Sequence, residues 1–252
     1  KRVISKRPGT VAIAAAVMKR FPIEVVPHIL CAGMTKYEIE NQLIDLSFLD
    51  IQNVMALRGD GTGKHKEFIP KEGGYYHTNN LVEQIRNLNE GRYLDENLES
   101  PTPTNFCIGV AGYPEKHFEA PNIETDIENL KKKIDAGADY VITQMFFDNK
   151  VYYDFVDKCR KAGIEVPIIP GLKPLSSYKQ LTSLPEAFSL DIPVDLTKAI
   201  EEVKENKAAV YQIGAEWCAM QCKDLIAYGV PAVHFYTMGK SENITNILKE
   251  CF

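Results

Sequence analysis

The sequence has little of what marks a membrane, secreted or nucleic-acid-binding protein. No apolar run approaches the roughly 20 residues that a membrane-spanning helix needs, and no signal peptide is visible. The 29 Lys and Arg residues are outnumbered by 34 Asp and Glu residues, and the net charge of −5 argues against nucleic acid or an anionic membrane as partner. Since 45% of the residues are hydrophobic, we expect a cytoplasmic protein with one sizeable core.

Common nucleotide-binding and metal-binding motifs are also missing. There is no Walker A sequence, no GxGxxG and no metal-ligand spacing, so any nucleotide must be held without a P-loop or a Rossmann turn. The six cysteines are scattered, although Cys218 and Cys222 lie four apart on an expected helix, which suits a metal or a redox pair. No His or second close Cys pair completes such a site, and we interpret both as small buried residues in a reducing compartment.

What the sequence does contain is a repeated pattern of short apolar or β-branched runs that end in polar residues. Amphipathic stretches long enough to be helices separate the runs, and this alternation predicts a parallel sheet. In a parallel βα barrel, polar residues at the C-terminal ends of strands are typically catalytic. We expect such positions for His28, Asp60, Tyr113, His117 and Gln144. The six runs are Glu24–Cys31, Asn53–Asp60, Phe106–Glu115, Tyr140–Asp148, Val166–Leu172 and Ala232–Met238.

The first expected element is a helix, Thr10–Phe21, with Thr10 as its cap, and not a strand. A barrel of this type closes on eight strands at roughly 30 residues per βα unit, so six runs predict that about 60 residues are missing upstream. We therefore predict an α/β fold, a TIM (βα)8 barrel from which the first two βα units are absent. Residues 1–252 would form a single catalytic domain that supplies strands 3 to 8.

Two more helices and one loop carry local signals. Thr35 and Glu38 have the spacing of a capping box, which predicts a helix start. A second helix is expected over Leu81–Leu88. The polar segment Gly59–Tyr76 is too long for a simple connector, which indicates a binding loop. The apolar face expected for the first of these helices consists of Ile39, Leu43, Leu46 and Leu49.

The helix expected over Ile123–Ala136 has a polar face with a candidate function. Asp126, Asn129 and Lys133 lie three and four residues apart, with Lys132 beside them, and Ile127, Leu130 and Ile134 face the core. Such a face is ordinarily only solvated. The aromatic ring and imidazole of Tyr113 and His117 precede it at a strand end, and this combination favours a site for an anionic cofactor.

Three other candidates carry weaker signals. Lys173 follows a strand end, where a Schiff-base lysine of an aldolase-like barrel would lie, but nothing near it in sequence would depress its pKa. His234 is flanked by apolar residues inside a strand, which favours a hydrogen-bonded core histidine. The run Met145–Phe147 is interpreted as core packing and not as part of a cofactor site.

Several strings of sequence resemble the methylenetetrahydrofolate reductase family, in its short bacterial form. They are PHILC, NVMALRGD, GVAGYPEKHFEAPN…DIENLKKKIDAGADYVITQMFFD, IIPGLKPL and VHFYTMGK, in order from about Pro8 to Phe252. The resemblance implies a TIM barrel with FAD at its C-terminal mouth. It also implies an oxidoreductase, a homo-oligomer, that uses NADH or NADPH to reduce 5,10-methylenetetrahydrofolate to 5-methyltetrahydrofolate for methionine synthesis.

The same resemblance assigns the flavin contacts. The cationic Lys132 and Lys133 would meet the flavin phosphates, and Asp126 with Asn129 would bind hydroxyls. The implied set is His28, Arg58, Gly59, Asp60, His77, Tyr113, His117, Ala120, Asp126, Asn129, Lys132 and Lys133.

The implied catalytic residues are Asp60 and Gln144. Asp60 would oppose the cation that forms on the folate as its ring opens, and Gln144 would orient the pterin or the nicotinamide, which bind alternately. The family's general acid is a Glu in a Phe-Glu-Phe-like run on the first strand, and this sequence contains no such run. The implied folate contacts are Asp60, Gln144, Gln180, Leu184, Tyr236 and Lys240.

Two alternatives stay open. One is a different barrel enzyme, such as an aldolase or a pterin-binding methyltransferase, which would show no flavin absorbance. The other is a flavin-binding relative with impaired catalysis that lacks the general acid of the first strand. No feature of the sequence favours NADH over NADPH.

Overall fold

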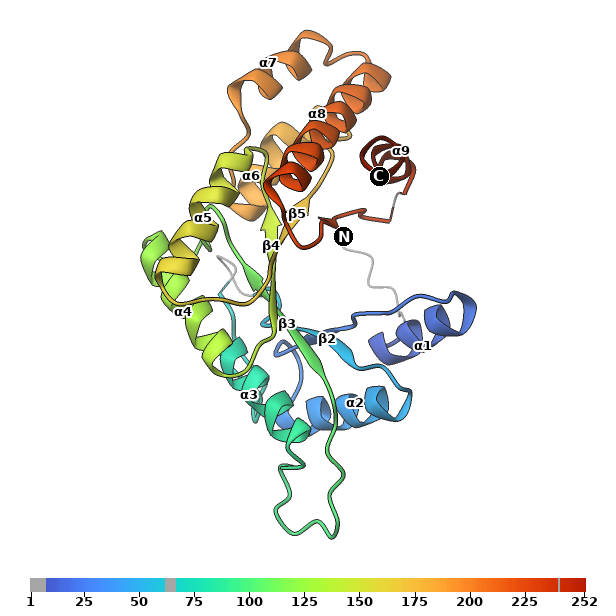
Figure 1. Ribbon diagram of the computed structural model, residues 1–252, viewed down its shortest axis with the longest axis vertical. Helices are drawn as coiled ribbons and strands as arrows, with labels where there is room; N and C mark the ends of the chain where they lie inside the picture. Colours follow the sequence, from blue (N-terminus) through green and yellow to red (C-terminus); the bar gives the residue numbers. More distant parts are fainter. Residues whose placement is uncertain (1–7, 62–66, 240) are drawn as a thin grey trace. The chain divides into compact units, whose positions relative to one another are not determined.

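The sheet is parallel, and its strands follow one another in chain order. The computed structural model describes residues 8–61, 67–239 and 241–252. Within these ranges the strand order is β1-β2-β3-β4-β5-β6, and every recorded strand pair is parallel (Figure 1). Each strand lies inside one of the six predicted runs, so the parallel α/β class is confirmed. The strands are β1 His28–Leu30, β2 Asn53–Leu57, β3 Cys107–Gly112, β4 Tyr140–Met145, β5 Ile168–Leu172 and β6 His234–Phe235.

Helices occupy the intervals between the strands, as the alternation predicted (Figure 1). Among the described residues, no helix combines the length and the apolar composition that crossing a membrane requires. The helices are α1 Thr10–Arg20, α2 Lys36–Phe48, α3 Thr78–Asn89, α4 Ile123–Asp135, α5 Asn149–Lys161, α6 Gln180–Phe188, α7 Val194–Glu202, α8 Lys207–Tyr228 and α9 Glu242–Cys251.

The chain divides into two compact units, so the single domain expected from the sequence stays a prediction. The first unit holds the described part of Lys1–Val110 together with Lys132–Asp139. In it, β1 pairs with β2 and β2 with β3, so that His28 lies opposite Met55. Helix α1 packs against α2, and α3 contacts β2.

The second unit holds Ala111–Lys131 and Tyr140–Phe252. Here β4 pairs with β5 and β5 with β6, and α8 packs against α5, α7 and α9 (Figure 1). A hydrophobic cluster joins the end of β4 to α6, α7 and α8, and this cluster is the part of the core that supports the strand ends. Its buried members are Met145, Phe147, Leu175, Leu184, Leu190, Leu196, Ile200 and Val210.

The ends of α1 and α2 show which local sequence signals predicted a helix boundary correctly. The capping box is confirmed, because the Thr35 side chain accepts from the Glu38 amide and the Glu38 carboxylate accepts from the Thr35 amide. The prediction for Thr10 was wrong, since Gly9 is the N-cap of α1 and Thr10 is already helical. The prediction for Leu49 was also wrong: α2 ends one residue earlier, and this side chain is 40% exposed.

Helix α8 approaches the chain after β5 so closely that only a glycine fits at one position. A Cβ atom built on Gly214 would lie 2.0 Å from the carbonyl oxygen of Leu175, which is backbone and cannot rotate away. Gly9 offers a contrast, because no atom lies within 4 Å of a Cβ built there.

We expect Gly214→Ala to lower the free energy of unfolding by about 1–3 kcal/mol, since α8 must shift away from Leu175 and overpacking typically costs this much. The control, Gly9→Ala, adds a Cβ that meets no other atom and should cost only about 0.5 kcal/mol, because glycine is a better N-cap than alanine. Denaturant unfolding of both variants measures the difference. Equal stability of the two would show that α8 does not pack this closely.

Candidate functional site

In the first unit, the end of β2 presents Arg58, Gly59 and Asp60. The Arg58 guanidinium lies 5.0 Å from the centre of the Phe68 ring, and the Arg58 carbonyl accepts from the Ala32 amide at 2.9 Å. Gly59 has a φ of +88°, and a Cβ there would lie 2.6 Å from the Cβ of Ala32. Only glycine therefore fits between the ends of β1 and β2. The next side chain, Asp60, is left exposed at the strand end.

Two histidines of the predicted set also lie in the first unit. His77 is the N-cap residue of α3; its ring meets that of Tyr76 edge-on at 4.7 Å, and its carbonyl accepts the Cys31 thiol. His28 was expected at the C-terminal end of a strand, and this was wrong. Pro27 precedes it and β1 is short, so His28 is the first residue of the strand. His28 is exposed at the surface, and partial desolvation of its imidazole lowers the pKa of the ring.

In the second unit, the loop after β3 is built around His117. The rings of Tyr113 and His117 meet edge-on at 4.7 Å. The carboxylate of Asp126, in the first turn of α4, accepts from the His117 amide at 2.9 Å, and the His117 carbonyl accepts from the Ala120 amide. Asp126 is only 9% exposed, so a purely solvated α4 face is wrong at this position. Asn129 and Lys132 on the same helix are exposed, and Lys133 is half-buried.

The residues expected to bind folate have structural partners of their own. The side-chain oxygen of Gln144 accepts from the Met145 amide at 3.0 Å, and that of Gln180 accepts from the Ser176 amide at 2.7 Å. Leu184 is 6% exposed and belongs to the hydrophobic cluster. The Tyr236 hydroxyl donates to the Thr143 carbonyl at 2.8 Å. Lys240, like residues 62–66 of the expected binding loop, lies outside the described residues. The assignment of this set to ligands stays a prediction.

The weaker candidates are also placed. Cys218 and Cys222 are free thiols that are buried, and burial raises the pKa of both, which confirms their interpretation as small buried residues. The run Met145–Phe147 is buried and confirmed as core packing. His234 is half-buried and meets the Tyr236 ring at 4.7 Å, so it is not a fully buried core residue. Lys173 is 7% exposed.

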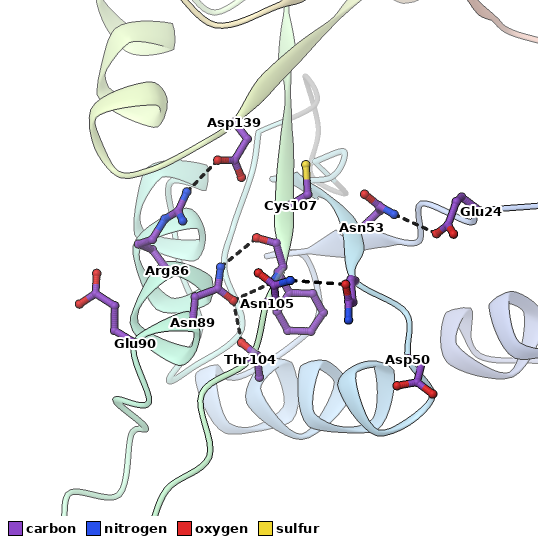
Figure 2. A pocket seen from close by; sticks show the side chains of 12 residues that line it. Glu24, Asp50, Asn53, Arg86, Asn89, Glu90, Thr104, Asn105, Cys107 and Asp139 are labelled. Atoms are coloured by element: carbon purple, nitrogen blue, oxygen red, sulfur yellow. Dashed lines mark hydrogen bonds and ion pairs between the residues drawn. The ribbon is translucent and has the colours of Figure 1, made fainter.

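A polar pocket of about 790 Å³ opens at the opposite ends of the strands in the first unit, where Asn53 begins β2 and Cys107 begins β3. Figure 2 shows that its side chains bond to one another: Arg86 pairs with Asp139 at 2.9 Å, and Asn89 accepts from the Thr104 hydroxyl. None of the predicted site residues lines it. In a parallel βα fold this end typically serves stability.

Sequence reasoning missed Glu115, which lies between Tyr113 and His117. Its carboxylate accepts from the Asp191 amide at 2.5 Å and lines a pocket of about 270 Å³. Burial, with smaller contributions from the charges of Asp191 and Asp148, raises the pKa of Glu115 to about 7. The only sequence signal was its position after a strand end, because its hydrogen-bond partner, the Asp191 amide, lies 76 residues further along the chain.

We expect Glu115→Gln to stabilise the protein above pH 7. Between the ordinary pKa of 4.5 and the raised value of about 7, the native state binds a proton that the unfolded state does not. The wild type therefore loses stability as the pH rises through this window, whereas the neutral amide does not titrate. The unfolding free energy of the variant relative to wild type should rise from pH 5 to pH 8. The exposed Glu165→Gln is the control, and an equal pH dependence in both variants would contradict the burial of Glu115.

Comparisons with known proteins identify the family of this chain. The chain matches the family model of methylenetetrahydrofolate reductase over residues 3–251. It is 36% identical over 248 residues to methylenetetrahydrofolate reductase (NADH) 1 of Arabidopsis thaliana, covering 95% of this chain and 40% of that protein. With 5,10-methylenetetrahydrofolate reductase of Escherichia coli K12 it is 32% identical over 240 residues, covering 94% of this chain and 73% of that one. The chain thus spans about 40% of the length of the plant relatives.

The fold has a counterpart among solved structures. A protein from Clostridium thermocellum, described as binding two copies of 5-methyl-5,6,7,8-tetrahydrofolic acid, matches with a TM-score of 0.55 and 15% identity, over 93% of this chain and 74% of that one. This likeness concerns the fold alone and agrees with the predicted TIM-barrel class, in which parallel strands follow in chain order. By the family match over nearly its whole length, the chain belongs to the methylenetetrahydrofolate reductase family.

Proposed function

We propose that this chain carries the flavin-dependent reduction of 5,10-methylenetetrahydrofolate to 5-methyltetrahydrofolate by NADH or NADPH. The observation that carries the proposal is the family match over residues 3–251, which includes every strand end with a predicted site residue. The proposal includes a cytoplasmic homo-oligomer that supplies methyl groups for methionine synthesis.

The chemistry of the side chains fits FAD. When bound, FAD accepts a hydride from the nicotinamide and passes it to the folate. Lys132 and Lys133, near the end of α4, supply two cations for its phosphates. Gly59 lacks a side chain beside Ala32, where a Cβ would clash, so the ends of β1 and β2 lie close together beside Asp60. Tyr113 and His117 provide aromatic surface held by the Asp126 carboxylate.

Asp60 has the role of a fixed negative charge. Ring opening of the methylene-folate places a positive charge on the folate nitrogen, and a carboxylate beside that nitrogen stabilises the transition state. Asp60 follows Gly59 at the end of β2 and is exposed, so it is accessible to a ligand. Once cofactor and folate cover it, water is displaced and the electrostatic effect becomes larger.

Of the residues expected to bind folate, some would contact the ligand and others would hold the site in shape. The Gln144 oxygen accepts from the Met145 amide, so its amide hydrogens are the groups available to a ligand. The oxygen of Gln180 accepts from the amide and the hydroxyl of Ser176, which orders the chain after β5. Leu184 is buried in the hydrophobic cluster, where it fixes α6. We assign Gln144 to contact, and Gln180 and Leu184 mainly to shaping the site.

We expect Asp60→Asn to slow the transfer of hydride to the folate by about 10²–10³, because it keeps the shape but removes the charge opposite the developing cation. Reduction of the flavin by the nicotinamide forms no comparable cation on the folate and should change far less. Stopped-flow absorbance of each half-reaction in the full-length protein separates the two.

The matched control is Asp45→Asn, an exposed carboxyl on α2 in the same unit, which should change neither half-reaction. Equal slowing of both half-reactions by Asp60→Asn would contradict the role assigned to this carboxylate.

A further inference from the structure

Strand β4 carries an irregularity at Thr143–Gln144. Its residues Val141 and Ile142 lie opposite Ile168 and Ile169 of β5, but the next pair is Met145 with Gly171. From Ile142 to Met145 β4 advances three residues, whereas β5 advances two, from Ile169 to Gly171. One extra residue therefore bulges out of β4 at Thr143–Gln144, and bulges of this kind change the direction in which a side chain points.

The residues of β5 that face the bulge provide no ordinary backbone donor for Thr143. Pro170 has no N–H group. The N–H of Gly171 donates to the hydroxyl of Thr143 at 2.9 Å. A Cβ on Gly171 would lie 2.3 Å from the Thr143 carbonyl oxygen, so the two backbones touch there and a side chain does not fit. Thr143 is fully buried, and its carbonyl needs a donor from elsewhere.

That donor is the hydroxyl of Tyr236, which follows β6 and lies 2.8 Å from the Thr143 carbonyl oxygen. The Tyr236 ring packs over Gly171, where a Cβ would come within 2.7 Å of it, and against the hydrophobic cluster. Burial raises the pKa of Tyr236 to about 12, so its hydroxyl remains a donor throughout the physiological range.

The position of the Thr143 carbonyl fixes that of Gln144. The peptide group between these residues is planar, so holding the carbonyl also holds the Gln144 nitrogen and Cα. From that position the Gln144 side-chain oxygen accepts from the Met145 amide at 3.0 Å. An N–H donor there requires the oxygen of the carboxamide and not its nitrogen, which settles which way the amide faces. The amide hydrogens take no part in this bond, so they can donate to another acceptor.

We propose that Tyr236 is a positioning residue whose bond to the Thr143 carbonyl holds the β4 bulge, so that Gln144 presents amide hydrogens to its ligand. The ligand group that meets Gln144 is then a hydrogen-bond acceptor, such as a carbonyl oxygen of the pterin or of the nicotinamide carboxamide. This inference rests on the proposed function for the identity of the ligand, and on the β4 geometry alone for the role of Tyr236.

Tyr236→Phe removes the hydroxyl and keeps the ring. The matched control is Tyr152→Phe, because the buried Tyr152 hydroxyl also donates to a strand carbonyl, that of Ile168 at the start of β5. The hydrogen-exchange rate of the Met145 amide in the native full-length protein measures directly how well the bulge is held, and it needs no ligand. We expect exchange at least about tenfold faster in Tyr236→Phe than in Tyr152→Phe, as for the loss of one buried hydrogen bond. Equal exchange in the two variants would overturn the positioning role.

The functional part is tested by a double-mutant cycle with Gln144→Ala. Tyr236→Phe alone should lower kcat/KM for methylenetetrahydrofolate on the order of tenfold, and in the Gln144→Ala background it should have almost no further effect. An undiminished effect in that background, or no effect in the wild-type background, would overturn the proposal. A full-length wild type that does not reduce this folate would instead refute the proposed function, and the Met145 exchange would still decide the role of Tyr236.

Discussion

Backbone groups near the carboxyl ends of the strands must find hydrogen-bond partners beyond the ladder, and two residues of the candidate site, Asp126 and Tyr236, supply such partners. A buried peptide group without a hydrogen-bond partner costs about as much free energy as a lost hydrogen bond. The conformation of each loop therefore depends on the partner that its peptide groups find. The Arg58 carbonyl accepts a hydrogen bond from the Ala32 amide. The His117 amide donates to the Asp126 carboxylate, and the Thr143 carbonyl accepts from the Tyr236 hydroxyl. Within each unit the same bonds set the loop geometry and the direction of neighbouring side chains.

This requirement separates residues that we propose to contact a ligand from residues that support them. Asp126 and Tyr236 were both expected to touch a ligand, yet each bonds the backbone of a neighbouring candidate, His117 in one case and the residue before Gln144 in the other. Asp60 is exposed at its strand end, and it has the charge that the chemistry needs. A substitution at a supporting residue should therefore act through the residue that it holds.

The sequence predicted the features that depend on local pattern. Each strand lies in a predicted run, and the capping box at Thr35 formed as expected, because these signals need only neighbouring residues. It did not predict features that depend on distant segments. The hydrogen bond of Glu115 requires the loop at Asp191, and the bulge at Thr143–Gln144 depends on the pairing of β4 with the next strand. His28 was misplaced because the length of β1 depends on its pairing with β2.

The central claim is that the strand-end residues of this chain bind a flavin that transfers hydride from a nicotinamide to methylenetetrahydrofolate. The most direct measurement is the anaerobic absorbance of the purified full-length protein with FAD. Addition of NADH or NADPH should bleach the flavin band, and subsequent addition of 5,10-methylenetetrahydrofolate should restore it, with 5-methyltetrahydrofolate as the product. Absence of bound flavin, or a bleached flavin that methylenetetrahydrofolate does not reoxidise, would contradict the claim.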